Sequence, residues 1–288
     1  IRGILDDAAT RVVIADAGVC ERLSDLPVRW MDAGQGYEEA ASGWEPHLGL
    51  PSDLAYIMFT SGSTGKPKGT LIEQAGVVRL VKGNAFHQVQ PGERILQTGA
   101  LAFDASTFEI WAALLNGGSV CLPKGRALLD MEEFGRMVRN WRIDTLFLTT
   151  GLFNQLVDYS IDSFGGLKTL MTGGERVSVR HVNALRKEYP GLKLLHVYGP
   201  TENTTFSTWY RVDRDHDHDI PIGEPIRQSE IYILDRFGMP VPSGVVGELC
   251  CGGPGLARGY LNDPLLTARK FVPNSYSAAP GSRLYRTG

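Results

Sequence analysis

The sequence predicts an α/β fold, with layered, largely parallel sheets and helices, plus a smaller β-rich subdomain. Between about residues 54 and 198, short apolar runs alternate with amphipathic segments. This strand–helix order favours a parallel sheet covered by helices. After about residue 211 the apolar runs become shorter and are separated by Gly and Pro. We therefore divide the chain into an α/β portion, residues 1–210, and a β-rich subdomain, residues 211–288.

The first elements follow from local apolar patterns. We expect a helix at residues 2–8, a strand at 11–16 and a surface loop at 35–52. A buried apolar strand at 54–60, a short strand at 70–74 and a helix at 77–86 should follow. The loop before the short strand is rich in Gly, Ser and Thr, which favour turns over regular structure.

The clearest helix lies in the middle of the chain. Met131, Phe134, Val138 and Trp141 recur at the spacing of one helix face. We then expect a strand at residues 145–149, a helix at 151–159 and a strand at 167–174. A helix with Val179, Val182 and Leu185 on its inner face and a strand at residues 193–199 follow. We expect Ser178 to cap the helix that follows it. In the β-rich part, residues 235–238 predict a hairpin turn.

Composition excludes several classes of partner. The 288 residues are 43% hydrophobic and 21% charged with a net charge of −3, which predicts neither a nucleic-acid partner nor a membrane surface. No apolar run approaches the roughly 20 residues of a membrane span. Cys20, Cys121, Cys250 and Cys251 form no spaced metal or redox motif, and we interpret the adjacent pair as small buried strand residues. This cysteine usage predicts a cytoplasmic location.

The loop after residues 54–60 has the composition of a phosphate site. It reads Thr-Ser-Gly-Ser-Thr-Gly-Lys-Pro-Lys-Gly over residues 60–69. Glycines let backbone N–H groups approach a phosphate, hydroxyls add donors, and lysine adds positive charge. It is not a Walker A loop, because Pro67 follows Lys66 where that pattern needs Ser or Thr. The alternative is a flexible surface turn.

Four segments, in a fixed order, resemble the adenylate-forming enzymes. Residues 60–69 are similar to the first motif of that superfamily and residues 198–202, Tyr-Gly-Pro-Thr-Glu, to its second. Residues 247–249 with 255–260 are similar to the third, and residues 285–288 to the start of the fourth. The superfamily includes acyl- and aryl-CoA ligases, luciferases and adenylation domains of non-ribosomal peptide synthetases. The resemblance implies part of the large domain of such an enzyme.

The resemblance implies that a carboxylate attacks the α-phosphate of ATP and releases pyrophosphate. The protein then acts mainly by placing reactants and neutralising charge. Thr64 and Glu202 take the catalytic roles, and Glu202 is also the implied ligand of Mg²⁺, which prefers oxygen. The implied ATP-binding residues are Thr60, Ser61, Gly62, Ser63, Thr64, Gly65, Lys68, Gly173, Gly174, Glu175, Tyr198, Gly199 and Thr201.

Within that set, Tyr198 is the implied stacking partner of adenine, and residues 173–175 line the nucleotide from the other side. The chain departs from the family pattern at one nearby position. His196 stands where the family usually has Asn, two residues before Tyr198.

The segment Phe-Asp-Ala-Ser at residues 103–106 points to an amino-acid substrate. A carboxylate among apolar residues is costly to bury unless a cation pairs with it, and a substrate α-ammonium is such a cation. The segment resembles the peptide-synthetase branch, in which this aspartate, here Asp104, holds the amino group. The alternative is that Asp104 only caps a helix or turn.

The resemblance also implies an amino-acid pocket. Alignment with the peptide-synthetase branch assigns it to Asp104, Ala105, Phe108, Leu148, Met171, Gly173, Val197, Thr205 and Phe206. Apart from Asp104 and Thr205, these residues are apolar or lack a side chain. We therefore expect an aliphatic substrate, namely valine, isoleucine or leucine, because a polar side chain would lack a partner there.

The family context implies further parts. The expected partner is a peptidyl carrier protein whose phosphopantetheine arm receives the activated amino acid. The small C-terminal domain of the family, which supplies a lysine, lies outside these 288 residues, so we expect ligand binding with weak catalysis. An acyl- or aryl-CoA ligase and a non-catalytic nucleotide-binding fragment remain the alternatives.

Two further features are interpreted without a catalytic role. Alternating Asp and His at residues 213–219 resemble a metal site by residue type, but a solvated loop is the preferred interpretation. His87 and His181 each stand alone on predicted helices, and we interpret them as surface or packing residues.

Overall fold

The structure is a computed structural model that describes residues 1–35, 48–61, 66–123 and 130–288. Its largest sheet has seven strands in the order β11–β10–β9–β8–β7–β5–β6, and the five strands from β9 to β6 run parallel. The strands of this sheet are β5 (Arg94–Leu96), β6 (Ser119–Cys121), β7 (Thr145–Thr149), β8 (Thr169–Gly173), β9 (Lys193–Tyr198), β10 (Thr208–Arg211) and β11 (Glu224–Pro225). The predicted α/β class is confirmed.

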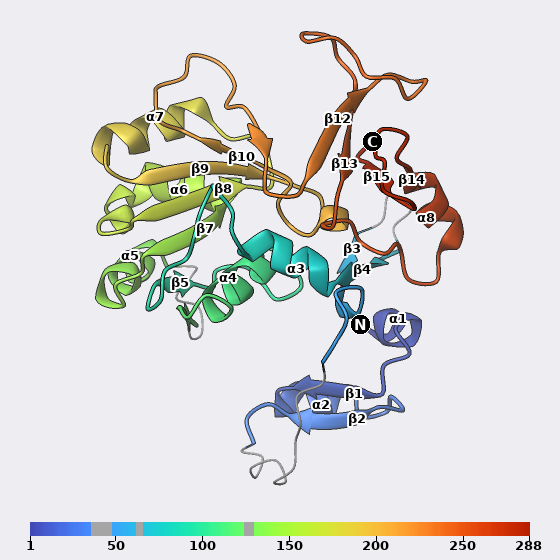
Figure 1. The fold of residues 1–288 in the computed structure, drawn as a ribbon. Helices are drawn as coiled ribbons and strands as arrows, with labels where there is room; N and C mark the ends of the chain where they lie inside the picture. The colour runs from blue at the N-terminus through green and yellow to red at the C-terminus, as the bar shows by residue number, and fades with distance from the viewer. Residues whose placement is uncertain (36–47, 62–65, 124–129) are drawn as a thin grey trace.

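Helices cover both faces of the large sheet (Figure 1). On one face α5, α6 and α7 pack against Leu146 and Leu148 of β7, and on the other α3 and α4 pack against Phe147. Burial on both faces explains why the central strands are almost continuously apolar in the sequence. These helices are α3 (Gln74–Val81), α4 (Ala105–Leu114), α5 (Met131–Asn140), α6 (Thr150–Tyr159) and α7 (Val179–Glu188).

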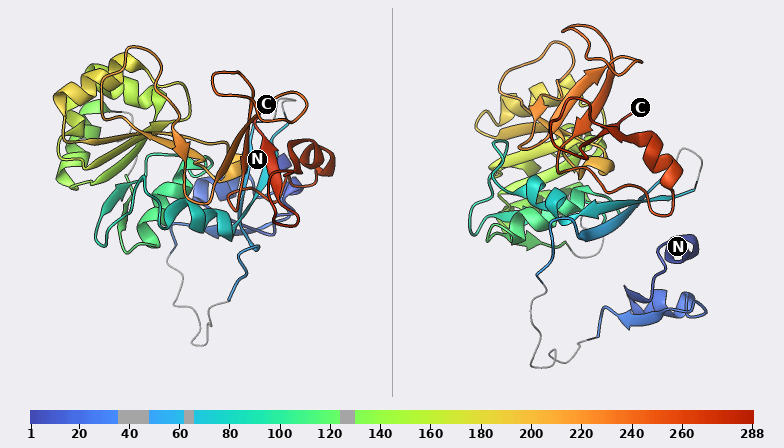
Figure 2. Two further views of the ribbon diagram at one scale, coloured as in Figure 1. Left: turned by 45° about the horizontal axis from the view of Figure 1, so that its top comes forward. Right: turned by 45° about the vertical axis from the view of Figure 1, so that its right-hand side comes forward.

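Three smaller sheets are also present among the described residues. A parallel pair near the N-terminus stands away from the rest, whereas an antiparallel pair and a four-stranded antiparallel sheet lie together (Figures 1 and 2). Their strands are β1 (Val12–Ala15) and β2 (Arg29–Asp32), β3 (Leu54–Thr60) and β4 (Lys68–Glu73), and β12 (Glu230–Leu234), β13 (Glu248–Gly252), β14 (Phe271–Pro273) and β15 (Arg283–Arg286). The remaining helices are α1 (Arg2–Asp7), α2 (Ala17–Arg22), α8 (Pro264–Lys270) and the short 3₁₀ helices η1 (Ile161–Phe164) and η2 (Thr201–Asn203).

The helix predicted from Met131, Phe134, Val138 and Trp141 is confirmed as α5, and all four side chains join one apolar cluster. The Asp130 carboxylate caps it by accepting two backbone N–H groups, at 2.9 and 3.0 Å. Local sequence and tertiary packing thus agree on where this helix begins and which face it buries.

Two predicted elements near the phosphate loop differ in the structure. The strand at residues 54–60 is not fully buried, since Met58 is the one buried residue of β3, and within the described ranges this strand pairs with β4 alone. The helix predicted at residues 77–86 begins earlier and ends at Val81. It ends there because Asn84 donates to the carbonyls of the last turn, at 2.8 and 2.9 Å. His87 therefore lies in a loop, and its predicted helical position is wrong.

Ser178 stands at the predicted N-cap of α7, but its hydroxyl does not cap the helix. It lies 2.6 Å from Nδ1 of His181 instead, and His181 also contacts Asp158. The inner face expected from Val179, Val182 and Leu185 is confirmed, because Val182 and Leu185 are buried and Val179 packs against the same cluster.

The turn at residues 235–238 is confirmed. Asp235 and Met239 join by a 2.8 Å backbone hydrogen bond, which closes a tight turn after β12. Further along, the chain changes sheets between Pro225, the end of β11, and Glu230, the start of β12. The division into domains at residue 210 stays a prediction.

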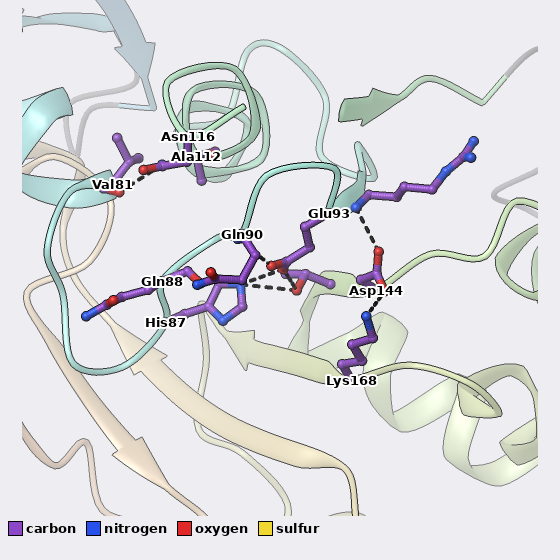
Figure 3. A network of polar contacts seen from close by, with 11 residues as sticks. Val81, His87, Gln88, Gln90, Glu93, Ala112, Asn116, Asp144 and Lys168 are labelled. Atoms are coloured by element: carbon purple, nitrogen blue, oxygen red, sulfur yellow. Dashed lines mark hydrogen bonds and ion pairs between the residues drawn. The ribbon is translucent and has the colours of Figure 1, made fainter. Parts of the chain in front are cut away.

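A buried polar network lies at the amino ends of β5 and β7, on the side of the large sheet opposite to the carboxyl ends of its parallel strands. His87 Nε2 lies 2.8 Å from Glu93 Oε1, and the hydroxyl of Thr145 donates to the same oxygen at 2.5 Å (Figure 3). The side chains of His87 and Glu93 are 8% and 9% exposed. Burial alone would raise the pKa of Glu93, but the hydrogen bonds from His87, Thr145 and the Gln90 N–H outweigh it and hold the pKa at about 2.

We predict that Glu93→Gln destabilises the protein by about 2 kcal/mol at pH 7. The folded-state pKa lies below the unfolded value, so the ionised carboxylate stabilises the native state above pH about 4.5 and loses this effect as pH falls toward about 2. Urea unfolding of both proteins at several pH values measures the difference, which should shrink with acid. The control is Glu188→Gln, on the exposed surface of α7. A difference that stayed constant with pH would contradict the role of the charge.

Candidate active site

The carboxyl ends of three parallel strands meet at one edge of the large sheet. In register, Thr149 of β7 pairs with Gly173 of β8, and Gly173 pairs with Val197 of β9. Ligands of open α/β sheets bind outside such carboxyl ends. The second motif begins at Tyr198, the last residue of β9, so this edge is the candidate site.

A charged cluster joins three distant segments at this edge. Lys68 of β4 donates to Glu202 Oε1 at 2.7 Å, and the hydroxyl of Tyr260 donates to the same oxygen at 2.6 Å. Lys68 Nζ also lies 3.2 Å from that hydroxyl and 4.6 Å from the centre of the Tyr260 ring. The phosphate-loop lysine, the second-motif glutamate and the third-motif tyrosine are thereby brought together.

The cluster keeps Glu202 ionised although its side chain is only 7% exposed. Burial alone would raise the pKa of Glu202, but the hydrogen bonds from Lys68 and Tyr260 and the charge of Lys68 outweigh it and lower the pKa. Burial raises the pKa of Tyr260, and the Glu202 carboxylate raises it further, so the phenol stays a neutral donor. The site thus holds a carboxylate whose charge is balanced by one lysine.

Tyr260 was not identified as a site residue from the sequence. Its position depends on β4, because three backbone hydrogen bonds of 2.7 to 3.0 Å join β4 to residues 258–261. The backbone N–H of Ala257 also donates to the Glu202 carbonyl at 2.8 Å. The third motif was a signal that the tyrosine belonged to the site, but the contacts with β4 span more than 180 residues, and only the fold brings these segments together.

The loop after Glu202 is tightly folded. Thr204 and Thr205 have φ of 45° and 67°, which branched residues rarely adopt and which costs on the order of 1–3 kcal/mol per residue. Gly199 has no room for a side chain, because a Cβ there would lie 2.2 Å from the Thr205 carbonyl oxygen. The hydroxyl of Thr205 donates to the backbone carbonyl of Asp104 at 2.8 Å. The loop therefore connects the Glu202 side of the site to Asp104.

Asp104 is a mostly buried carboxylate at the start of α4. It occupies the N-cap position, but its side chain makes no cap hydrogen bond. Burial raises the pKa of Asp104 and the nearby Glu202 carboxylate raises it too, while a hydrogen bond from the Thr201 hydroxyl lowers it. In the described part of the chain no Lys, Arg or His forms an ion pair with it. A purely capping role for Asp104 is therefore not supported.

Most of the predicted pocket residues gather in one apolar cluster on the α4 face of the sheet. Phe206 is the centre of an aromatic group, with ring centroids 5.4 Å from Phe108 and 5.7 Å from Phe147. Met171 and Val197 belong to the same cluster, and Ala105 packs against it. Thr205 is also buried, next to Asp104, and Gly173 ends β8.

Leu148 is the exception, and its assignment to the pocket is wrong. Side chains alternate across a strand, so Leu148 points to the face covered by α5, α6 and α7. Its neighbour Phe147 lies on the face of Met171 and Val197 instead. An alignment shift of one residue moved the choice to the opposite face.

The phosphate loop is described only at its ends. Gly62, Ser63, Thr64 and Gly65 lie outside the described residues, so the expected roles of these four stay predictions. Thr60 ends β3, and its buried hydroxyl has no hydrogen-bond partner among the residues that are described. Ser61 is exposed beside it. An unpaired hydroxyl donor next to Lys68 suits an anionic ligand.

The predicted nucleotide residues flank the same edge. Tyr198 ends β9, where burial raises the pKa of its phenol and the Thr287 hydroxyl hydrogen-bonds it. The carbonyls of Gly173 and Glu175, on either side of Gly174, accept from Thr150 at 3.2 and 3.1 Å. These bonds tie the loop after β8 to the start of α6.

His196 is occupied elsewhere. Its Nδ1 lies 2.8 Å from the carbonyl oxygen of Pro221, and burial lowers its pKa. The neutral imidazole therefore donates to the backbone of the loop before β11. This contact holds the loop to β9.

The acidic and histidine-containing segment and the adjacent cysteines have structural surroundings. In residues 213–219, Asp215 pairs with Arg186 and Asp219 with Arg176. Cys250 and Cys251 are buried in β13, as predicted. Across the described ranges, no group of three His, Cys, Asp or Glu side chains is arranged to hold a metal ion. Nor is any helix in those ranges both long and apolar enough to cross a bilayer.

Comparison with known proteins defines the class. A family model described as AMP-binding enzyme matches residues 1–261. The chain therefore belongs to the family of AMP-binding enzymes. Within that family it is of the adenylation-domain type found in non-ribosomal peptide synthetases.

Three relatives illustrate this placement. Gramicidin S synthase 2 of Brevibacillus brevis is 43% identical over 286 residues, which cover 99% of this chain and 6% of the synthetase. The N-terminal subdomain of Klebsiella oxytoca NpsA in complex with 3-hydroxyanthranilyl-AMSN has a TM-score of 0.86 at 29% identity, covering 99% of this chain and 72% of that one. NpsA-ThdA, an artificially fused adenylation–PCP di-domain NRPS from Klebsiella oxytoca, has a TM-score of 0.87 at 28% identity, covering 99% and 53%.

We predict that Asp104→Asn stabilises the ligand-free protein at pH 8, by about 1 kcal/mol, because it removes a buried charge that lacks a cation. The folded-state pKa lies above the unfolded value, so stability is lost as pH rises through the folded pKa. The gain should therefore disappear below pH about 4, where the carboxyl group is protonated in both states. Denaturant unfolding across this range measures it. Asp217→Asn, on the exposed loop, is the control, and an equal loss of stability at pH 8 and 4 would contradict the expectation.

Proposed function

We propose that this chain binds ATP and an amino acid and activates the acid as an aminoacyl-adenylate, with release of pyrophosphate. The observation that carries the proposal is Asp104, a mostly buried carboxylate with a raised pKa and no cationic partner among the described residues. A substrate α-ammonium would supply the missing charge. Fatty or aryl acids have no such group, and an acyl- or aryl-CoA ligase would leave this charge unpaired.

The neighbours of Asp104 support a reaction beside it. Thr201 hydrogen-bonds its carboxylate, and Glu202 is close enough to raise its pKa. An amino acid held at Asp104 would therefore have its own carboxylate near the Glu202 cluster. There it would meet the α-phosphate of ATP, in the arrangement that an in-line attack requires.

Charge neutralisation falls to the cluster around Lys68. Lys68 is 26% exposed and pairs with Glu202 from one side, so phosphate oxygens can reach its Nζ from the other. The Thr60 hydroxyl is a second donor without a partner among the described residues. Such groups lower the barrier by stabilising charge that develops on phosphate oxygens. Tyr198 is the proposed stacking surface for adenine.

Glu202 is also the proposed Mg²⁺ ligand. The donor set fits a hard cation in part, because Glu202 is an ionised oxygen ligand whose pKa is lowered. Lys68 and Tyr260 now bond to Oε1, so the second oxygen, Oε2, is the proposed metal contact. When bound, Mg²⁺ would neutralise phosphate charge beside the same cluster.

The proposed substrate side chain is aliphatic. The apolar cluster of Phe108, Met171, Val197 and Phe206, with Phe147 in place of Leu148, offers no partner for a charged or polar group. Thr205 is the polar exception, and its hydroxyl already donates to Asp104. Valine, isoleucine and leucine are therefore the proposed substrates. The proposed acceptor of the acyl group is a peptidyl carrier protein, the kind of domain fused to NpsA in the solved di-domain.

The test of this function is a binding series. Non-hydrolysable adenylate analogues bearing valine, phenylalanine, aspartate or lysine are added to the wild-type protein, together with a 3-methylbutanoyl analogue that lacks the amino group. We expect the valyl analogue to stabilise by about 2.7 kcal/mol at 100 times its dissociation constant, and the others less.

The comparison between the valyl analogue and the analogue without an amino group decides between the enzyme classes. Asp104→Asn should reduce binding of the valyl analogue at least tenfold and leave the other unchanged, because only the first carries an ammonium. Equal binding of both by the wild-type protein would favour an acyl-CoA ligase. No stabilisation by any analogue would contradict the proposed site.

A second test separates Phe147 from Leu148. We predict that Phe147→Ala enlarges the pocket and raises affinity for the phenylalanyl analogue relative to the valyl analogue by at least fivefold. Leu148→Ala removes a buried side chain of similar depth from the opposite face of β7, so it should lower stability by about 2–5 kcal/mol without changing that ratio. Calorimetric dissociation constants measure both. A change of the ratio in Leu148→Ala alone would restore the original assignment.

A further inference from the structure

Arg79 is a buried arginine of α3 that has no carboxylate partner among the described residues. Only 2% of its surface is exposed. Its guanidinium donates to the carbonyl oxygens of Phe206 at 2.6 Å, Thr204 at 3.3 Å and Asn203, and to the hydroxyl of Ser229 at 3.0 Å. A buried charge held only by neutral acceptors is costly, so its position needs a reason.

The three carbonyls belong to one short loop, residues 203–206. This is the loop in which Thr204 and Thr205 adopt positive φ, and the Phe206 N–H donates to the Thr204 carbonyl at 3.0 Å. Such backbone persists only where the surroundings impose it. Arg79 supplies those surroundings, since its two terminal nitrogens reach acceptors on both sides of the turn.

The same loop has a residue of the proposed site at each end. Glu202, the phosphate-side carboxylate, precedes it directly. Thr205 donates to the Asp104 carbonyl at 2.8 Å, and Phe206 is in the centre of the aromatic group of the pocket. A shift of the loop would therefore move both halves of the site relative to each other.

The third motif makes room for this arginine. A Cβ at Gly255 would lie 2.0 Å from Nη2 of Arg79, so the guanidinium packs directly against that glycine. The Thr204 hydroxyl also donates to the Gly255 carbonyl at 2.7 Å. With Ser229 just before β12, these contacts join α3, the loop and the β-rich part.

We propose that Arg79 is a positioning residue that sets the distance between the amino-acid pocket and the phosphate side of the site, by holding the carbonyls of residues 203–206. The proposal rests on the proposed function, because it names what the loop positions. Lysine cannot replace it: an ammonium is a compact charge, whereas a guanidinium presents planar donors in fixed directions to several carbonyls at once.

The first experiment follows the loop without any ligand. Hydrogen–deuterium exchange of Arg79→Lys is compared with wild type and with Arg139→Lys, in which an exposed arginine donates to one carbonyl, of Asp162, at 3.0 Å. We expect exchange to increase at least tenfold in a peptide covering residues 203–208 and to stay unchanged in β7 and β8. Equal increases throughout the chain would mean a general structural role and overturn the proposal.

The second experiment measures coupling between the two halves of the site. The ratio of the dissociation constant of AMP to that of the valyl-adenylate analogue reports what the aminoacyl part adds to binding. General destabilisation lowers both affinities equally and leaves this ratio unchanged. We expect Arg79→Lys to reduce the ratio at least tenfold and Arg139→Lys to leave it within twofold.

A second variant keeps the test valid if Arg79→Lys does not fold. Gly255→Ala retains the arginine and displaces its guanidinium, so the ratio should again fall, by at least threefold. An unchanged ratio in a folded Arg79→Lys, or in Gly255→Ala where that variant replaces it, overturns the proposal. A wild-type protein that binds no valyl analogue contradicts the proposed function, while exchange in residues 203–208 still decides whether Arg79 holds the loop.

Discussion

The contact between Lys68 and Glu202 is the interaction on which the rest of the site depends. It joins β4, which leads out of the phosphate loop, to the segment after β9, and Tyr260 brings the β-rich part to the same oxygen. Each of these segments belongs to a different sheet or to the link between sheets. One balanced ion pair, supported by the neutral phenol of Tyr260, therefore holds β4, the segment after β9 and the β-rich part together.

Two carboxylates at this edge have opposite environments. Glu202 has its pKa lowered by hydrogen bonds and by a nearby lysine, whereas Asp104 has its pKa raised by burial without any cation among the described residues. Groups whose surroundings shift their pKa values apart are typical of sites with divided roles. Under the proposed function, the balanced carboxylate suits the proposed phosphate and metal side, and the unbalanced one suits a ligand that brings its own positive charge.

Backbone strain and glycine are linked in the same region. The loop after Glu202 holds two threonines at positive φ, and the glycines of the second and third motifs lie where this loop and Arg79 pack against them. Gly199 leaves room for the loop itself, and Gly255 leaves room for the guanidinium. These glycines therefore have a packing reason besides any contact with a nucleotide. The strained backbone of this loop lowers stability, and hydrogen bonds donated by Arg79, Thr204 and Thr205 offset that loss.

The sequence by itself determined the α/β class, the amphipathic helix α5, the central apolar strands and the order of the motifs, because each depends on local periodicity or on a contiguous string. It also predicted roles for Asp104 and Glu202, and these roles stay predictions. Only the tertiary structure decided which face of β7 meets the proposed pocket, and so favours Phe147 over Leu148, since a shift of one residue reverses a strand face. Tyr260 and Arg79 likewise took their places from contacts between segments far apart in the chain, which no local pattern encodes.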